Sequence, residues 1–215
     1  SDELVVTAAD EGGMTFVTGT THANYINFAD GTSGNAAYRG FLKYDHNNDN
    51  MTLGTSAASA MVIDANGHIN KPLQSAFLVK ATENNNFAAT TTITMAFGTE
   101  IFDQNGDFAS NIFTAPVTGR YSFQVNITTS DLAIDYHWVY CYVGTSNRTC
   151  YVSSVDPRMF DTAGGYSLGG AILVDMDAND TATLYFRSSA HGTNTVDIVA
   201  NTTNPETYFS GYLVC

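Results

Sequence analysis

The chain has 215 residues, and 21 acidic against 8 basic residues give it a formal net charge of −13 at pH 7. This balance argues against a nucleic-acid-binding protein, because phosphate recognition needs clustered Lys and Arg. The 44% of hydrophobic residues suffice for a core. The abundance of Thr, Asn, Ser and Gly is typical of strands and turns, and no apolar run is long enough to span a bilayer.

Residues 1–71 combine short strand-like pieces with frequent turn signals. Extended pieces such as 25–28 and 40–44 alternate with turn-forming runs such as 30–34 and 64–67. A single copy with so few large apolar side chains would struggle to bury enough surface to offset its loss of conformational entropy. We therefore expect a β shaft in which identical chains intertwine, so that each short strand finds neighbours from other protomers.

The same segment resembles part of the tail fibres and related appendages of bacteriophages. The resemblance rests on YINFADGTSG at 25–34, YRG at 38–40, KYDH at 43–46 and MVIDANG at 61–67. In such proteins this segment belongs to a trimeric β shaft that precedes a C-terminal head. The resemblance therefore implies the same arrangement here.

Lys71-Pro72 marks the boundary of a second domain, 72–215. Pro72 disfavours helix before it, and an extended run at 75–79 follows as the first strand. The polar stretch 82–92 is predicted to be a surface loop. Further strands are predicted at 134–143, 148–153, 166–175, 181–188, 194–199 and 209–214. This number and spacing indicate a β sandwich or jelly roll.

Residues 97–127 carry the clearest strand signal in the chain. From 119 to 127 apolar and polar side chains alternate, which predicts a strand with one buried and one wetter face. We expect Tyr121 and Phe123 in one layer and Gln124 on the opposite face, where three chains meet.

This stretch resembles the signature of the C1q/TNF-like jelly-roll family. The gap between Phe108 and Phe113 is shorter than in the family, and Val125 stands where an aromatic residue is usual. The resemblance covers about residues 72–215 and implies a homotrimeric head, with Tyr121, Phe123, Gln124, Phe209 and Leu213 in its core and trimer contacts. The matching residues are Phe97, Asp103, Phe108, Phe113, Gly119, Tyr121 and Phe123, followed by YFSGYL at 208–213.

Three cysteines leave the redox state open. Cys141 and Cys150 flank a hairpin that would turn at Thr145-Ser146, which predicts that they lie opposite each other. They would then form a cross-strand disulfide or remain two small buried apolar residues, and we prefer the second interpretation. Cys215 has no assigned role.

An aromatic stripe in the predicted strand 134–143 is the candidate receptor-binding surface. Alternation sends Val139, Cys141 and Val143 to the core and turns the stripe outward, where rings with polar tips stack on sugars or anchor protein interfaces. The alternative is that the stripe packs against a neighbouring protomer or under a loop. With one ring from the partner hairpin strand, the candidate residues are Tyr136, Trp138, Tyr140, Tyr142 and Tyr151.

The acidic turns do not predict a specific metal site. Runs 45–49 and 175–180 offer oxygen ligands, but the second lacks the Gly and the bidentate acid of an EF-hand loop, so both are predicted to be strand-connecting turns. Some C1q-like trimers hold calcium near their axis, which an acidic trimer favours, although no ligand set is evident. The five histidines lie in separate segments and no catalytic motif occurs. We expect no enzyme, and no cofactor other than that calcium.

The sequence thus predicts an all-β homotrimer with a short intertwined shaft, 1–71, and a C1q-like jelly-roll head, 72–215. The resemblances imply the distal part of a phage tail fibre or similar virion appendage, located outside the cell. Its head would bind a host cell-surface glycan or outer-membrane component by multivalent adhesion. The implied partners are its own copies, the host surface and other virion tail proteins, without nucleic acid or membrane insertion. Two alternatives are a head that only registers three chains, and a secreted C1q-domain lectin or signalling protein, against which the absent collagen repeat argues.

Overall fold

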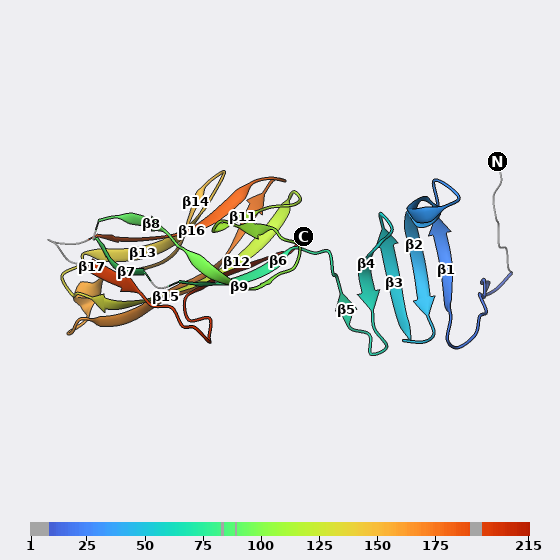
Figure 1. The fold of residues 1–215 in the computed structure, drawn as a ribbon, viewed down its shortest axis with the longest axis horizontal. Coiled ribbons are helices and arrows are strands. Elements are labelled where there is room, and N and C mark those ends of the chain that lie inside the picture. Colours follow the sequence, from blue (N-terminus) through green and yellow to red (C-terminus); the bar gives the residue numbers. More distant parts are fainter. Residues whose placement is uncertain (1–8, 83, 89, 190–194) are drawn as a thin grey trace. The chain divides into compact units, whose positions relative to one another are not determined.

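A computed structural model of the chain describes residues 9–82, 84–88, 90–189 and 195–215. The chain divides into two compact units, Ser1–Leu73 and Gln74–Cys215. Strands dominate both units, and the helices among the described residues are short 3₁₀ turns (Figure 1). The all-β prediction is confirmed. No described helix has the length and apolar character needed to cross a membrane.

The first unit is a single antiparallel sheet. Its strands pair in chain order, β1-β2-β3-β4-β5 (Figure 1). Asp45 and Asp64 begin two of the turns, where each carboxylate accepts a hydrogen bond from the amide two residues later, at 3.0 and 2.8 Å. The elements are β1 (Ala23–Phe28), η1 (Gly34–Tyr38), β2 (Gly40–Asp45), β3 (Asn50–Thr55), β4 (Ala58–Ile63) and β5 (Ile69–Asn70).

The strand partners of this sheet lie in the same chain, which differs from the intertwining predicted from the sequence. β1 pairs along its whole length with β2, and β2 pairs likewise with β3. Short connections bring consecutive strands together at a small cost in loop-closure entropy, so pairing within the chain is favoured over pairing between chains. Each strand is hydrogen-bonded to its neighbours within the chain, yet the sheet has only one layer.

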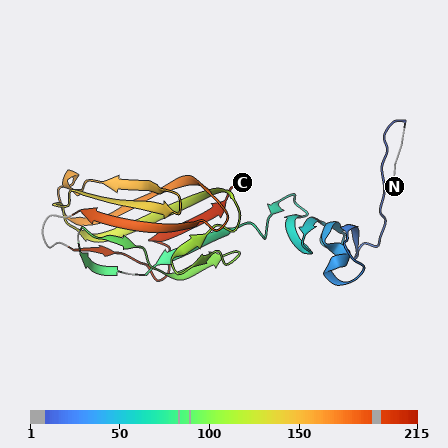
Figure 2. The ribbon, with the colours of Figure 1, turned by 90° about the horizontal axis from the view of Figure 1, so that it is seen from above.

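The second unit is a sandwich of two antiparallel sheets (Figures 1 and 2). The β12 sheet comprises β6 (Ala76–Ala81), β7 (Asn84–Ala88), β9 (Phe97–Asp103), β12 (Gly119–Leu132), β15 (Gly164–Met176), β17 (Thr195–Ile198) and β18 (Tyr208–Leu213). The β13 sheet comprises β8 (Thr92–Thr94), β10 (Phe108–Ala109), β11 (Ile112–Thr114), β13 (Trp138–Thr145), β14 (Thr149–Val155) and β16 (Thr181–Ser189). A second 3₁₀ turn, η2 (Pro157–Met159), joins β14 to β15.

β12 is the central strand of its sheet. It pairs with β15 on one side and with β17 and β18 on the other. Tyr121 and Phe123 are fully buried, as is Phe209 on the neighbouring β18, and Leu213 packs at the margin of the core. Gln124 points to the opposite face and is half-buried. The alternation of buried and wetter residues predicted at 119–127 is therefore confirmed in β12.

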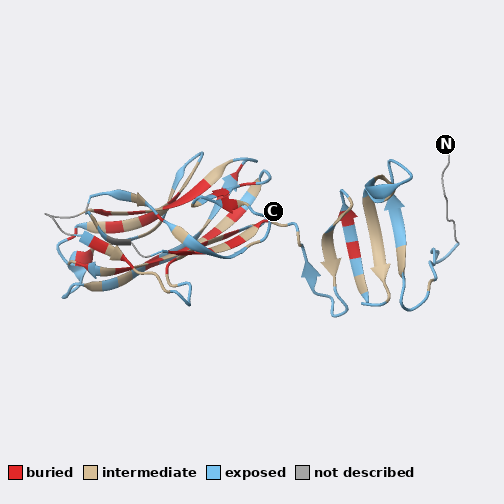
Figure 3. Cartoon of the chain, in the orientation of Figure 1, coloured by how far each residue is buried: buried red, intermediate tan, exposed pale blue. Residues whose placement is uncertain are grey.

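A cluster of phenylalanine rings joins the two sheets. Phe77 on β6 stacks on Phe108 and Phe113 of the other sheet, with centroid distances of 5.0 Å in both cases. Phe209 meets Phe77 edge to face at 5.1 Å. Such pairs contribute about 0.5–1.5 kcal/mol each beyond the burial of their area. Figure 3 shows the buried residues gathered between the sheets.

The prediction of a surface loop at 82–92 is wrong over much of this range. Residues 84–88 form β7, which pairs with β17, and β8 begins at Thr92. The ring of Phe87 meets Phe186 edge to face at 5.5 Å, so one aromatic residue anchors an otherwise polar strand. Residues 83 and 89, and residue 194 of the strand predicted at 194–199, lie outside the described residues.

Replacing Gly119 by Val should destabilise the sandwich. A Cβ at this position would lie 2.6 Å from the carbonyl oxygen of Cys215 and 2.8 Å from Leu213 Cδ1. We expect a loss of about 2 kcal/mol in the free energy of unfolding, which is typical of overpacking, measured by urea denaturation. Gly164→Val is the control, because a Cβ there meets nothing within 4 Å. Equal stability of the two variants would contradict the prediction.

Candidate ligand-binding surface

The outer face of the β13 sheet carries a cluster of aromatic rings. Val139, Cys141 and Val143 are fully buried, so the alternate residues of β13 point outward. The neighbouring strands β14 and β16 add rings and one guanidinium to the same face. The aromatic patch consists of Trp138, Tyr140, Tyr142, Tyr151, Tyr185 and Arg187.

The rings of the aromatic patch contact one another in a continuous chain. Trp138 stacks on Tyr140 with centroids 4.7 Å apart, and Tyr142 stacks on Tyr185 at 4.9 Å. Tyr151 is 65% exposed and meets Tyr140 edge to face at 5.2 Å. Because each ring is supported by its neighbours, the surface is held in shape before any ligand binds.

Strand register places these rings side by side. Tyr142 lies opposite Tyr151 on β14 and opposite Tyr185 on β16. The predicted pairing of Cys141 with Cys150 would place Tyr140 opposite Tyr151. The hairpin turn instead spans Thr145 to Arg148, and its Thr145 amide donates to the Arg148 carbonyl at 2.8 Å. The turn is therefore centred one residue later than predicted.

The same shift separates the two hairpin cysteines. Cys150 lies opposite Val143, and a bulge in the pairing with β14 places Cys141 opposite Ser153. Both cysteines are free thiols, as expected, but only Cys141 is fully buried and Cys150 is half-buried. Burial raises the pKa of the Cys141 thiol to about 11.

Gly144 makes room for the stack of Tyr185 on Tyr142. A Cβ on Gly144 would lie 2.8 Å from Cε2 of Tyr185, which is closer than van der Waals contact allows. The missing side chain therefore lets the Tyr185 ring lie flat against Tyr142. Glycine at this position is a requirement of the patch, rather than of a turn.

Arg187 supplies the positive charge of the aromatic patch. Its Cζ lies 5.6 Å from the centroid of Trp138, within cation–π range. Its Nη1 donates to the Tyr140 hydroxyl at 3.4 Å, whereas its buried Nε finds no hydrogen-bond partner among the described residues. The guanidinium thus places a positive charge directly beside the rings.

Tyr142 stays protonated in this setting. Burial, and then the neighbouring hydroxyls of Tyr185, Tyr140 and Tyr151, raise the pKa of Tyr142 above its ordinary value. Its hydroxyl therefore remains a neutral hydrogen-bond donor and acceptor at physiological pH. Neutral hydroxyls at the edge of stacked rings suit recognition of polyhydroxylated ligands.

Tyr136 does not belong to the aromatic patch, which corrects the sequence prediction. β13 begins at Trp138, not at 134, and Tyr136 lies in a preceding turn, where its amide donates to the Ala133 carbonyl at 3.4 Å. The turn breaks the period-2 alternation, so the side chain enters the core and is fully buried. Tyr136 is unavailable to a ligand.

Sequence reasoning missed Tyr185 and Arg187. Both lie on β16, whose alternate residues Leu184 and Phe186 are fully buried. The same alternation, applied to 181–188, would have turned Tyr185 and Arg187 outward. Their place beside β13 depends on the pairing of β16 with β13, which local sequence does not reveal.

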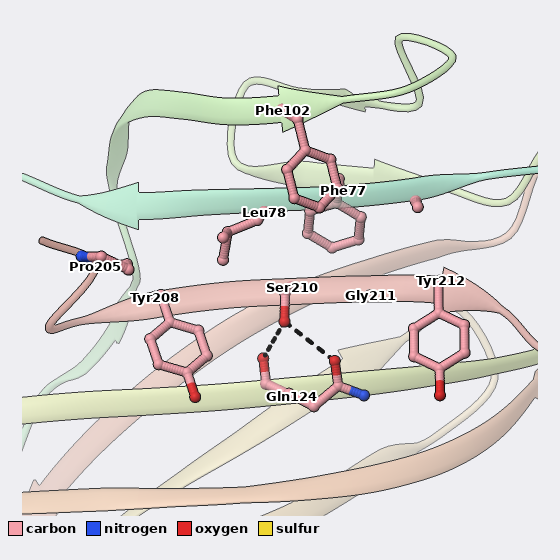
Figure 4. A pocket seen from close by; sticks show the side chains of 10 residues that line it. Phe77, Leu78, Phe102, Gln124, Pro205, Tyr208, Ser210, Gly211 and Tyr212 are labelled. Carbon is pink, nitrogen blue, oxygen red and sulfur yellow. Dashed lines mark hydrogen bonds between the residues drawn. The ribbon is translucent and has the colours of Figure 1, made fainter. Parts of the chain in front are cut away.

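A second candidate surface lies on the outer face of the β12 sheet. Ser210 donates to the Gln124 side-chain oxygen at 3.1 Å, and Tyr208 and Tyr212 flank Ser210 on β18 (Figure 4). Leu78 lies opposite Ser210 on β6, and Phe102 lies opposite Leu78 on β9. Together they line a groove of about 610 Å³ with an apolar wall and a polar floor.

The acidic turns are strand connections. The Asp177 amide donates to the Asp180 carboxylate at 2.8 Å, and the Asp180 amide donates to the Asp177 carbonyl at 3.0 Å. These bonds close the turn between β15 and β16. Among the described residues, no three His, Cys, Asp or Glu side chains gather in a way that could hold a metal ion. The calcium expectation stays a prediction.

A two-sheet antiparallel jelly roll with these outer faces defines the class of the second unit. Residues 76–214 match the family model of the C1q domain, and the chain belongs to the C1q family. The predicted C1q-like jelly-roll head is thereby confirmed. Domains of this family are generally non-enzymatic, form homotrimers and occur in proteins that are typically extracellular.

Solved structures similar to this chain include two of low sequence identity. The globular domain of zebrafish complement 1qA protein is 16% identical, with a TM-score of 0.47 over 66% of this chain and 98% of that chain. A crystal structure of murine APRIL at pH 8.0 is 12% identical, with a TM-score of 0.46 over 65% of this chain and 98% of that chain. No curated protein sequence matches the chain.

The cysteines should differ sharply in reactivity. Because its pKa lies near 11, the buried Cys141 thiol is protonated at pH 8, and it is also shielded from reagents. Cys215 is exposed. We expect maleimide at pH 8 to label Cys215 in the native protein and Cys141 only after unfolding, as read by peptide mass spectrometry. Rapid native labelling of Cys141 would contradict its buried position.

Proposed function

We propose that the protein is an extracellular homotrimeric adhesin whose C1q head binds a cell-surface glycan through the aromatic patch. The observation that carries this proposal is a supported, solvent-facing set of rings with neutral hydroxyl tips and one guanidinium. Aromatic faces stack on the apolar faces of sugars, and the hydroxyls and the guanidinium then bond the sugar hydroxyls. Three such sites on one trimer raise avidity without a tight single site.

In this proposal the three heads pack through the groove on the β12 sheet. The groove offers apolar area at Leu78, Phe102 and Tyr212, with Gln124 and Ser210 supplying polar contacts at its floor. A mixed apolar and polar surface of this kind is typical of protein interfaces. The arrangement leaves the aromatic patch on the opposite sheet open to ligand.

The finer proposal is that this adhesin is the distal part of a phage tail fibre or similar virion appendage that binds a host cell surface. Its support is the sequence resemblance at 25–67. Other virion tail proteins would then be its further partners. Tail or capsid genes beside the coding gene would support this assignment. A gene surrounded by genes for secreted proteins would favour a secreted C1q-domain lectin or signalling protein instead.

Trp138→Ala should abolish most glycan binding without changing assembly. Loss of a central Trp anchor costs about 2 kcal/mol, or roughly 30-fold in affinity per site. Binding would be measured on an array of bacterial surface polysaccharides, and trimer mass by light scattering. Tyr25→Ala is the control, because this exposed ring lies in the first unit.

Each outcome of that experiment decides between the candidate roles. Loss of binding by an intact Trp138→Ala trimer supports the adhesin. Wild-type trimer that binds no glycan favours a head that only registers three chains. A Trp138→Ala protein that binds as well as wild type places the glycan site outside the aromatic patch. Loss of the trimer places the aromatic patch in the interface.

Gln124→Ala should weaken the trimer rather than the fold. The side chain holds Ser210 at 3.1 Å and donates to Ser122 at 2.7 Å, and it lies outside the core. We expect dissociation to begin at a roughly 30-fold higher protein concentration than for wild type, as for loss of a contact worth about 1.4 kcal/mol at each of the three interfaces of a trimer, measured by light scattering on dilution. Thr94→Ala, on the opposite sheet, is the control. An unchanged dilution profile for Gln124→Ala would exclude the groove as the trimer contact.

A further inference from the structure

The β1–β5 sheet presents one face made almost wholly of apolar side chains. Because directly paired residues share a face of a sheet, the register defines a row across four strands, Ile26, Leu42, Leu53 and Met61. A second row contains Tyr44, Met51 and Ile63, and it ends at Ile69 on β5. We call these residues, with Phe28 at the end of β1, the apolar face.

No other described part of the first unit shields this face as a core would. Phe28 is 65% exposed, Ile69 59% and Leu53 44%. Apolar side chains this exposed over a contiguous area mark an interaction surface. The single-layer sheet therefore lacks the second layer that sheets of this kind normally require.

The opposite face of the sheet is already covered by the same chain. The Phe41 ring lies over Gly54, where a Cβ would come within 2.1 Å of the ring, and Thr52 is buried. Tyr38 of η1 lines a hollow on this side together with Tyr25 and Phe41. Lys43 and Asp45 form an ion pair here at 3.0 Å. This covered, charged side is called the polar face.

Charge decides which partner fits the apolar face. The chain carries a net charge of −13, so copies of it repel one another wherever acidic residues meet. The strand residues on the apolar face include no Asp, Glu, Lys or Arg, whereas those on the polar face include Lys43 and Asp45. Identical copies can therefore bring these strand residues together without like charges among them. The carboxylate of Asp49, which accepts from the Tyr44 hydroxyl at 3.3 Å, lies in the turn at the rim of the face.

The size of the apolar face points to the same partner. Four strands of six residues, spaced by ~4.8 Å with a rise of ~3.3 Å per residue, cover roughly 400 Å². That is about half of the area that each partner buries in a stable independent interface. A face of this size needs its partners to be tethered, and a homotrimeric head tethers three copies at an effective concentration of about millimolar.

Edge-to-edge pairing is a poor alternative. It would join β1 of one copy to β5 of the next, and β5 has only two residues. Such a short strand offers few hydrogen bonds to a partner. Packing of the faces completes the layer that the sheet lacks, and pairing of the edges does not.

We propose that three copies of the chain turn the apolar faces of their β1–β5 sheets toward a common axis and bury them against one another. This inference rests on the homotrimer of the proposed function and assigns which face each sheet contributes. Leu53 and Met61 lie in the buried row, and the polar face looks outward.

Methionine oxidation tests the proposal in the full chain. Met51 lies on the apolar face and is 37% exposed in one copy, whereas Met159 in the second unit is 79% exposed and Met95 is buried. Because oxidation follows exposure, we expect hydrogen peroxide to oxidise Met51 at least about fivefold more slowly than Met159, approaching Met95. Peptide mass spectrometry gives the rates, and light scattering gives the mass of the same sample.

The variants Leu53→Glu and Ser59→Glu test which of the two faces is buried in the trimer. Leu53→Glu would place three carboxylates at the axis, so Met51 should lose its protection while the heads hold the trimer mass. Ser59→Glu adds the same charge to the polar face of the adjacent strand and should leave Met51 protected.

Three results would overturn the inference. In the first, the protein is a trimer but Met51 is oxidised about half as fast as Met159, as their exposures in one copy imply. The homotrimer of the proposed function would then stand, but the apolar faces would not be buried in it. A monomer with Met51 protected means that the chain's own N-terminal segment covers the face. Oxidation of Met51 that slows only when lipid vesicles are added means that the face binds a membrane.

Discussion

The second unit depends on the contact between phenylalanine rings of its two sheets. Phe77 touches rings from both sheets and therefore fixes how far apart the sheets lie and how they are aligned. Gly211 makes room for this packing, since a Cβ there would lie 2.4 Å from Phe123. Because successive residues of a strand point to opposite faces, the residues that these rings fix on the inner faces also determine which residues lie on the outer faces. The groove is the outer face of strands whose inner residues form this cluster. The aromatic patch is the outer face of strands in the other sheet, whose inner residues, such as Val139 and Phe186, belong to the same hydrophobic core.

This shared origin has a consequence for binding. The outward rings of β13 alternate along the strand with Val139, Cys141 and Val143, which are fully buried. Moving the strand to rearrange the patch would therefore disturb the core. A ligand that stacks on it loses little affinity to ordering of the protein. The patch and the groove also occupy different sheets of the sandwich, so ligand recognition and assembly do not compete for the same residues.

Strands with a strong local alternation could be predicted from the sequence, whereas the pairing of strands that are distant in sequence could not. The alternation at 119–127 predicted β12 and its buried residues, and the family signature predicted the jelly roll. The polar run around Phe87 concealed β7, because one ring packed on Phe186 outweighs the weak strand preference of its asparagines. Tyr136 was misplaced because a turn interrupts the alternation before Trp138. Tyr185 and Arg187 joined the site through the contact of β16 with β13, which is distant in sequence.

The meander of the first unit can gain or lose strands in evolution without disturbing the rest of the chain. Each of its strands is hydrogen-bonded only to the strands before and after it in the chain. Inserting or deleting one hairpin would therefore widen or narrow the sheet by two strand spacings, about 10 Å, and leave the remaining register untouched. Such modular growth is familiar from repeat proteins, whose units contact only their neighbours. The length of this region can thus vary between relatives while the domain that follows it stays the same.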